Sequence, residues 1–207
     1  IANIAGNSVE DYVKMTEILS DSAVDMLELN ISCPNVKEGG AAFGTRPESV
    51  SHIVGSVKAK AKKPLIVKLS PNVTSITDIA KAAESAGADC LSLINTLLGM
   101  RIDIKTRRPV LAMNVGGLSG PAVKPVAVRM VWQVRNSVKV PLIGMGGISN
   151  VEDAIEFFLA GASLVSVGTA MFVDPYAPVK IVYDLEAYME KNGLASLDEL
   201  IGKVRPY

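Results

Sequence analysis

A short polar run after an apolar segment carries the most reactive side chain of the sequence. Residues 27–30 (Leu-Glu-Leu-Asn) are typical of a strand, and Ile-Ser-Cys-Pro-Asn follows them. Pro34 lacks an N–H and has a fixed φ, so the chain leaves the sheet there and Cys33 is held at the turn. A thiol at a strand end is a candidate catalytic group, although a free cysteine is commonly a small buried hydrophobe.

The residues after this turn have the composition of a mobile lid. Residues 37–44 (Lys-Glu-Gly-Gly-Ala-Ala-Phe-Gly) contain three glycines and few side chains that could anchor the segment. Such segments often close over a bound ligand. The position of Cys33 beneath this predicted lid favours a reactive role over a purely structural one.

Further polar side chains lie at the ends of predicted strands. Lys68 is the only charged residue in the apolar segment 65–69, and burying a charge without a partner is costly. It therefore predicts an anionic ligand or a Schiff base, with a structural ion pair to Glu28 as the alternative. Asn30 and Asn95 offer donors and acceptors suited to a planar, amide-rich ring, although a single asparagine is more often a turn residue.

Glycines follow the last two predicted strands. Gly146 and Gly147 come after one strand, and Gly168 and Thr169 come after the next. Barrel proteins commonly bind phosphate at these positions through backbone N–H groups and a helix N-terminus. The glycines could instead only form tight turns, but two such sites, with Gly120 before them, favour phosphate binding.

The composition excludes several classes of function. The 207 residues include 21 basic and 21 acidic side chains, so nothing favours binding to nucleic acid or to an anionic membrane. No apolar run is long enough to span a bilayer. Two cysteines fit a reducing, cytoplasmic compartment, and Cys90, which begins an apolar strand, is expected in the core. The single histidine, His52, is expected on a helix surface, which gives metal sites and His-based triads little support.

Strands and helices alternate along the whole chain. Strands are predicted at residues 1–5, 27–30, 64–69, 90–96, 141–145 and 164–169. Helices are predicted at residues 8–19, 47–60, 76–85, 121–136, 151–159 and 178–190, with a short one near 197–202. This order predicts an α/β fold with a parallel sheet, either a (β/α)8 TIM barrel or an open doubly wound sheet. No G-x-G-x-x-G follows the first strand, and the polar residues gather at strand ends, which favours a barrel with about six of its βα units present.

One connection is too long to be a simple link. Residues 97–120 separate a predicted strand from the next helix. Apolar alternation in residues 101–105, followed by a second apolar run at 109–112, predicts a small hairpin above the barrel.

Taken together, these motifs resemble dihydroorotate dehydrogenase, from Ile1 to about Tyr188. The resemblance rests on residues 30–35 (NISCPN), 68–72 (KLSPN), 94–96 (INT), 117–121 (GLSGP), 146–148 (GGI) and 168–169 (GT). The segment 37–48, which ends in Thr-Arg-Pro-Glu, is similar to that of the class 1B, NAD-linked catalytic subunits rather than the class 1A enzymes. It implies that residues 1–207 form an FMN-binding TIM-barrel catalytic domain that oxidises dihydroorotate to orotate in pyrimidine synthesis.

The resemblance also implies roles for particular residues. Cys33 would be the base that removes the C5 proton while hydride passes from C6 to flavin N5, and Lys68 would lie beside flavin N1 and O2. The implied flavin-binding residues are Asn3, Asn30, Lys68, Ile94, Gly120, Gly146, Gly147, Gly168 and Thr169. The implied substrate-binding residues are Asn30, Asn35, Asn95 and Thr96.

The family pattern extends beyond this sequence in two respects. The chain begins without Met in a strand-like run, and the family has two earlier strands with a further lysine and an asparagine loop, so we expect the natural N-terminal part to be missing. Class 1B enzymes are expected to form homodimers that pair with an FAD and iron–sulfur subunit, which passes electrons to NAD. With two cysteines this chain could not hold a 2Fe-2S cluster, which would lie on the partner.

Other functions fit parts of the same pattern. The related dihydropyrimidine dehydrogenases share the flavin barrel. A phosphate-binding barrel lyase would use Lys68 as a Schiff-base nucleophile. A non-catalytic fragment that depends on an absent half of the barrel is the third alternative.

Overall fold

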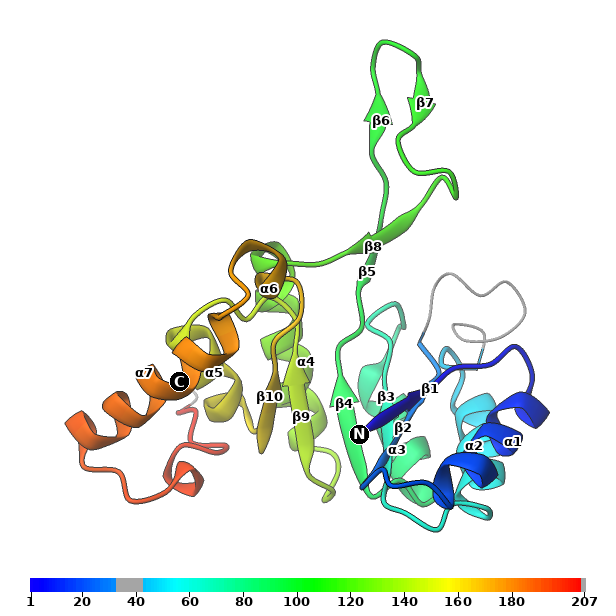
Figure 1. Cartoon of the computed structure of the whole chain (residues 1–207), viewed down its shortest axis with the longest axis horizontal. Coiled ribbons are helices and arrows are strands. Elements are labelled where there is room, and N and C mark those ends of the chain that lie inside the picture. Colours follow the sequence, from blue (N-terminus) through cyan, green and yellow to red (C-terminus); the bar gives the residue numbers. More distant parts are fainter. Residues whose placement is uncertain (33–42, 206–207) are drawn as a thin grey trace.

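The fold is built on one curled sheet of six parallel strands. A computed structural model describes residues 1–32 and 43–205 of the chain. The strands neighbour each other in chain order, from one edge to the other: β1 (Ala2–Ile4), β2 (Leu27–Asn30), β3 (Leu65–Lys68), β4 (Cys90–Leu93), β9 (Leu142–Met145) and β10 (Leu164–Ser166) (Figure 1). Parallel neighbours joined through helices confirm the predicted partial barrel, with β1 and β10 as its edges in the described chain.

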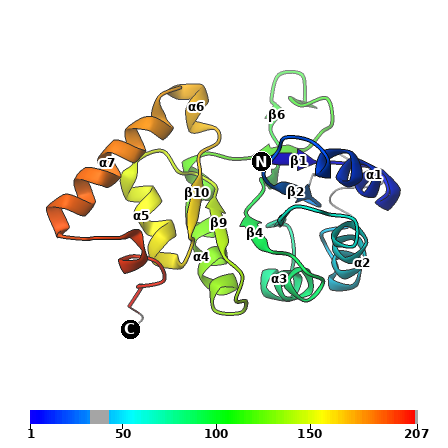
Figure 2. The ribbon, with the colours of Figure 1, turned by 60° about the horizontal axis from the view of Figure 1, so that its bottom comes forward.

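The helices lie on the outer side of this sheet (Figure 2). They are α1 (Val9–Ser20), α2 (Pro47–Lys58), α3 (Ile76–Ser85), α4 (Lys124–Arg135), α5 (Val151–Ala160) and α7 (Ala177–Asn192). Local signals set their ends: the Ser8 hydroxyl accepts the Asp11 N–H at the start of α1, and Gly87 and Gly161 take positive φ values where α3 and α5 end. No helix in the described ranges is long and apolar enough to cross a membrane.

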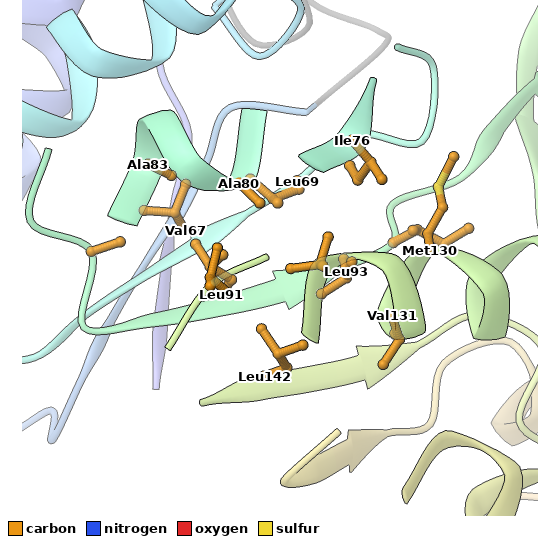
Figure 3. Close-up of a cluster of buried hydrophobic side chains, with 14 of the residues drawn as sticks. Val67, Leu69, Ile76, Ala80, Ala83, Leu91, Leu93, Met130, Val131 and Leu142 are labelled. Atoms are coloured by element: carbon orange, nitrogen blue, oxygen red, sulfur yellow. The ribbon is translucent and has the colours of Figure 1, made fainter. Parts of the chain in front are cut away.

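The main core fills the layer between the sheet and the helices. Side chains of Val67, Leu91 and Leu142 on neighbouring strands are buried in one cluster with α3 and α4 (Figure 3). Leu91 and Leu142 have no solvent exposure, and burying such a side chain contributes about 1.5–3 kcal/mol to folding. Since strand side chains alternate, the intervening residues face the concave side of the sheet.

A long arm projects from the end of the sheet at which the strands finish (Figure 1). Strands β5 (Leu97–Gly99) and β8 (Gly116–Leu118) pair antiparallel at its base, and β6 (Ile102–Asp103) and β7 (Arg108–Pro109) pair beyond them. This confirms the predicted hairpin, although the pairing at its base was not predicted.

Several predicted boundaries differ from those observed. The strands predicted to reach residues 96 and 169 end at Leu93 and Ser166. The helix predicted at 121–136 begins as a 3-10 turn, η2 (Pro121–Val123), before α4. Pro125 has no N–H to donate to the Pro121 carbonyl, so the α-helical bonds cannot start earlier. The short α6 (Ala170–Val173) was not predicted, and the predicted C-terminal helix is the 3-10 turn η3 (Leu197–Glu199).

Candidate active site

A pocket of about 220 Å³ lies where the strands end. It is open at the C-terminal ends of β3, β4, β9 and β10 and is bounded by the arm and η2. Its lining includes many of the predicted site residues: Lys68, Ile94, Asn95, Thr96, Gly146, Gly147, Gly168 and Thr169. Side chains that are far apart in the sequence therefore meet at one place, as expected for parallel strands that share a direction.

Lys68 contributes a cation without a counter-charge to this pocket. It is the last residue of β3, is half-buried, and forms no ion pair with any carboxylate in residues 1–32 or 43–205. The alternative of a structural ion pair with Glu28 is wrong. Glu28 instead accepts hydrogen bonds from Ser92 Oγ and from Asn3 Nδ2, each at 2.6 Å. Lys68 is thus available to an anionic or electron-rich ligand.

Asn3 and Asn30 lie on the neighbouring strands and outside the lining of this pocket. Asn3 is on the edge strand β1, where the Glu28 carboxylate fixes the direction of its amide. Because that carboxylate only accepts hydrogen bonds, the amide nitrogen of Asn3 points to it and the carbonyl oxygen points elsewhere. Asn30 pairs in register with Lys68 across β2 and β3, and the hydroxyl of Tyr12 donates to its backbone carbonyl at 2.8 Å.

A buried hydroxyl links two of the predicted polar residues. Ser32 is 1% exposed; its Oγ donates to Asn30 Oδ1 at 2.8 Å and accepts from Asn95 Nδ2 at 2.7 Å. The Asn95 Oδ1 also accepts the N–H of Thr96 at 2.8 Å. These bonds orient both amides, so Ser32 is a positioning residue that the sequence prediction missed. Its place in the same strand-end motif was the available signal.

The glycines form a backbone surface suited to an anion. Gly146 and Gly147 have φ values of 122° and 84°, which favour glycine. A Cβ on Gly147 would also lie 2.7 Å from the Gly120 carbonyl oxygen, so the loop packs directly against that backbone. Within the described chain, the N–H groups of Gly147, Gly168 and Thr169 donate no hydrogen bond. Unpaired N–H groups beside a glycine loop fit the phosphate of a bound cofactor.

Gly120 lies beside this pocket rather than in it. It lines an adjoining hollow of about 350 Å³ together with Ser149 and residues of α6 and α7. Ser119 and Thr169 border both spaces, so the hollow continues the pocket away from Lys68. The remaining lining residues were not predicted as site residues, although Leu118, Ser119 and Ile148 belong to motifs that carried the resemblance. They are Leu118, Ser119, Val123, Met145, Ile148 and Ser166.

Two predicted residues, Cys33 and Asn35, lie outside the described residues, as does the predicted lid up to residue 42. The other cysteine, Cys90, is 6% exposed and lies in the cluster with Ile66 and Ile143, which confirms its expected core position. Burial, together with the charges of Glu28 and Asp89, raises the pKa of the Cys90 thiol to about 11, so this thiol is protonated at neutral pH.

The described residues hold no cluster of metal-ligating side chains, and His52 lies away from the pocket. They contain no group of three or more His, Cys, Asp or Glu side chains placed to hold a metal ion. His52 is exposed on α2, as predicted, and does not line the pocket.

Comparison with known proteins agrees with this geometry. A family model described as dihydroorotate dehydrogenase matches residues 1–189. Proteins named dihydroorotate dehydrogenase B (NAD(+)), catalytic subunit, are similar over nearly the whole chain. That of Lachnoclostridium phytofermentans is 59% identical over 205 residues, which cover 99% of this chain and 68% of that protein. That of Alkaliphilus oremlandii is 59% identical over 204 residues, which cover 99% of this chain and 68% of that protein. That of Bacteroides thetaiotaomicron is 55% identical over 203 residues, which cover 98% of this chain and 67% of that protein. The chain therefore belongs to the dihydroorotate dehydrogenase family.

Proposed function

We propose that this chain carries the FMN site and the substrate site of an NAD-linked dihydroorotate dehydrogenase, which oxidises dihydroorotate to orotate in pyrimidine synthesis. The observation that carries the proposal is the pocket itself. It combines a cation with no carboxylate partner among the described residues, the oriented amide of Asn95, and a glycine surface suited to an anion, all at the carboxyl ends of parallel strands. Because the chain belongs to the dihydroorotate dehydrogenase family, we interpret this combination as a site for flavin and substrate.

The described residues fit FMN at two ends. Gly147, Gly168 and Thr169 offer unpaired N–H groups to the phosphate. Lys68, which pairs in register with Asn30 on β2 and with Ser92 on β4, offers positive charge to the ring. When bound, FMN would supply the hydride acceptor, and the negative charge that develops on the reduced ring would be stabilised by the Lys68 ammonium.

The amides on β2 and after β4 are suited to the substrate. Asn95 and Thr96 line the pocket, and Ser32 orders the amides of Asn95 and Asn30. A dihydropyrimidine ring presents alternating N–H and C=O groups, which such amides can bind in one orientation. Cys33, which follows Ser32 directly in the sequence, is proposed as the base that accepts the C5 proton.

We further propose that the complete enzyme is a homodimer with an electron-transfer subunit that holds FAD and a 2Fe-2S cluster. The relatives are themselves named as catalytic subunits linked to NAD(+). This sequence has two cysteines, too few for the four ligands of such a cluster, so the cluster would lie on the partner.

Binding of flavin and pyrimidine to the full-length protein tests the proposal. Purified protein is titrated with FMN, and orotate is then added while the visible spectrum is recorded. We expect stable flavin binding and a spectral change on addition of orotate, because both ligands share the pocket. A protein that binds no flavin, but is covalently trapped by borohydride with a carbonyl substrate on Lys68, would instead support the barrel lyase.

A further inference from the structure

An ion pair lies directly behind the glycine loop of the pocket. Lys124, the first residue of α4, places its Nζ 2.6 Å from Asp153 Oδ1 and 2.6 Å from Glu156 Oε1, both on α5. The Asp153 side chain is 10% exposed, whereas the Glu156 side chain is 48% exposed. The inner carboxylate is therefore the one that depends on Lys124 for charge compensation.

The buried carboxylate also clamps the loop that follows the glycines. Asp153 Oδ2 accepts the backbone N–H of Ser149 at 2.8 Å, and the Asn150 side chain accepts the N–H of Asp153 at 2.8 Å. Ser149 is only two residues beyond Gly147 and lines the hollow that continues the pocket. The end of the glycine loop is thus held by a negatively charged group.

Lys124 also packs against the same loop through its backbone nitrogen and its Cβ. A Cβ on Gly147 would lie 3.0 Å from the Lys124 backbone nitrogen and 2.9 Å from its Cβ, so no atom fits between them. Lys124 therefore packs against Gly147 and, through its ammonium, neutralises the Asp153 carboxylate that holds the end of the loop. The hydrogen bonds that Lys124 donates to Asp153 and Glu156 raise its pKa, which keeps the ammonium charged over the whole physiological range.

We propose that Lys124 is a positioning residue for the phosphate end of the flavin site. It neutralises Asp153, so that a carboxylate can hold the glycine loop without repelling the anion that the loop binds. Without Lys124, an unpaired buried carboxylate would remain beside the site for the phosphate. This inference rests on the proposed function, because it assumes that the loop binds FMN.

Comparing FMN with riboflavin, which lacks the phosphate, separates this role from a general structural one. In full-length protein, Lys124→Met should weaken FMN binding by about tenfold or more, because the phosphate meets an uncompensated charge. Riboflavin affinity should change by less than about twofold. The double variant Lys124→Met with Asp153→Asn should recover most of the FMN affinity, since the introduced amide can still accept the Ser149 N–H but carries no charge. Glu156→Gln, which removes only the exposed partner, is the matched control and should leave both affinities unchanged.

Several outcomes would overturn the proposal. Equal losses for FMN and riboflavin would make Lys124 a residue of general stability, and an unchanged FMN affinity would remove its role altogether. A double variant no better than Lys124→Met would contradict the charge argument. Lys124→Arg keeps the charge, so it should bind FMN normally, and it keeps the test decisive if Lys124→Met fails to fold. Failure of the wild-type protein to bind FMN would refute the proposed function itself, a result distinct from all of these.

Discussion

Replacing Lys68 with methionine should lower the reduction potential of bound FMN. The ammonium of Lys68 lines the pocket and has no carboxylate partner among the described residues, so its charge is available to the ring. Methionine keeps an unbranched side chain of similar length but removes the charge. The reduced ring carries more negative charge than the oxidised ring, so loss of a nearby cation disfavours reduction.

The size of this effect follows from the setting of Lys68. Two unit charges about 4 Å apart interact by about 4 kcal/mol at an effective dielectric constant of about 20. Lys68 is half-buried in a pocket that opens to solvent, so we take about half of that value, about 2 kcal/mol. For a two-electron couple about 1.4 kcal/mol corresponds to about 30 mV, which gives a fall of about 40 mV.

Spectroelectrochemical titration of the full-length protein measures this potential. Lys62→Met is the matched control, because the Lys62 side chain is 66% exposed, pairs with Asp21, and precedes β3, whereas Lys68 lies at the other end of that strand. The control should leave the potential unchanged. If Lys68→Met binds FMN with a wild-type or higher potential, the assigned position of Lys68 beside the ring is refuted.

The remaining predictions concern the base, the glycine loop and the buried thiol. Cys33→Ala should retain FMN but slow its reduction by dihydroorotate by about 10²- to 10⁴-fold in stopped-flow measurements, and Cys33→Ser should regain activity as the pH rises, because a serine needs a higher pH to act as a base. Equal rates for Cys33→Ala and wild type would exclude Cys33 as the base. Gly147→Ala should weaken FMN binding and lower the melting temperature, because its Cβ would lie 2.7 Å from the Gly120 carbonyl oxygen at a φ of 84°; normal FMN affinity would contradict the close packing of the loop. The Cys90 thiol, with a pKa raised from 9.0 to about 11, stabilises the fold fully below about pH 9. That contribution should be lost as the pH rises towards 11, so in urea unfolding the wild type should lose stability relative to Cys90→Ala over this range. Parallel pH profiles of the two proteins would refute the raised pKa of the Cys90 thiol.

Local signals explain why most of the fold could be predicted. Helix α3 was predicted with its observed bounds because Ser75 caps its start and Gly87 ends it, both short-range effects. The parallel sheet followed from continuous apolar strands between helices. The four-residue helix α6 was not predicted, since it is too short to show a helical period.

The site was harder to predict because its bonds join distant residues. The sequence indicated that Lys68 needed a partner but left Glu28 as an option. The structure removes that option, because the Glu28 carboxylate accepts hydrogen bonds from Ser92 on β4 and from Asn3 on the edge strand β1. Only the strand register determines which polar side chains share the concave face. The role of Ser32 between two amides was hidden for the same reason.

Anaerobic titration of the FMN-loaded, full-length protein with dihydroorotate tests the central claim most directly. The visible absorbance of oxidised flavin and the amount of orotate formed are followed together. The proposed function predicts that the flavin is bleached and that one orotate appears for each FMN reduced, because one hydride passes from each substrate molecule. Flavin that remains oxidised in the presence of excess dihydroorotate would contradict the assignment of this pocket as a dihydroorotate-oxidising site.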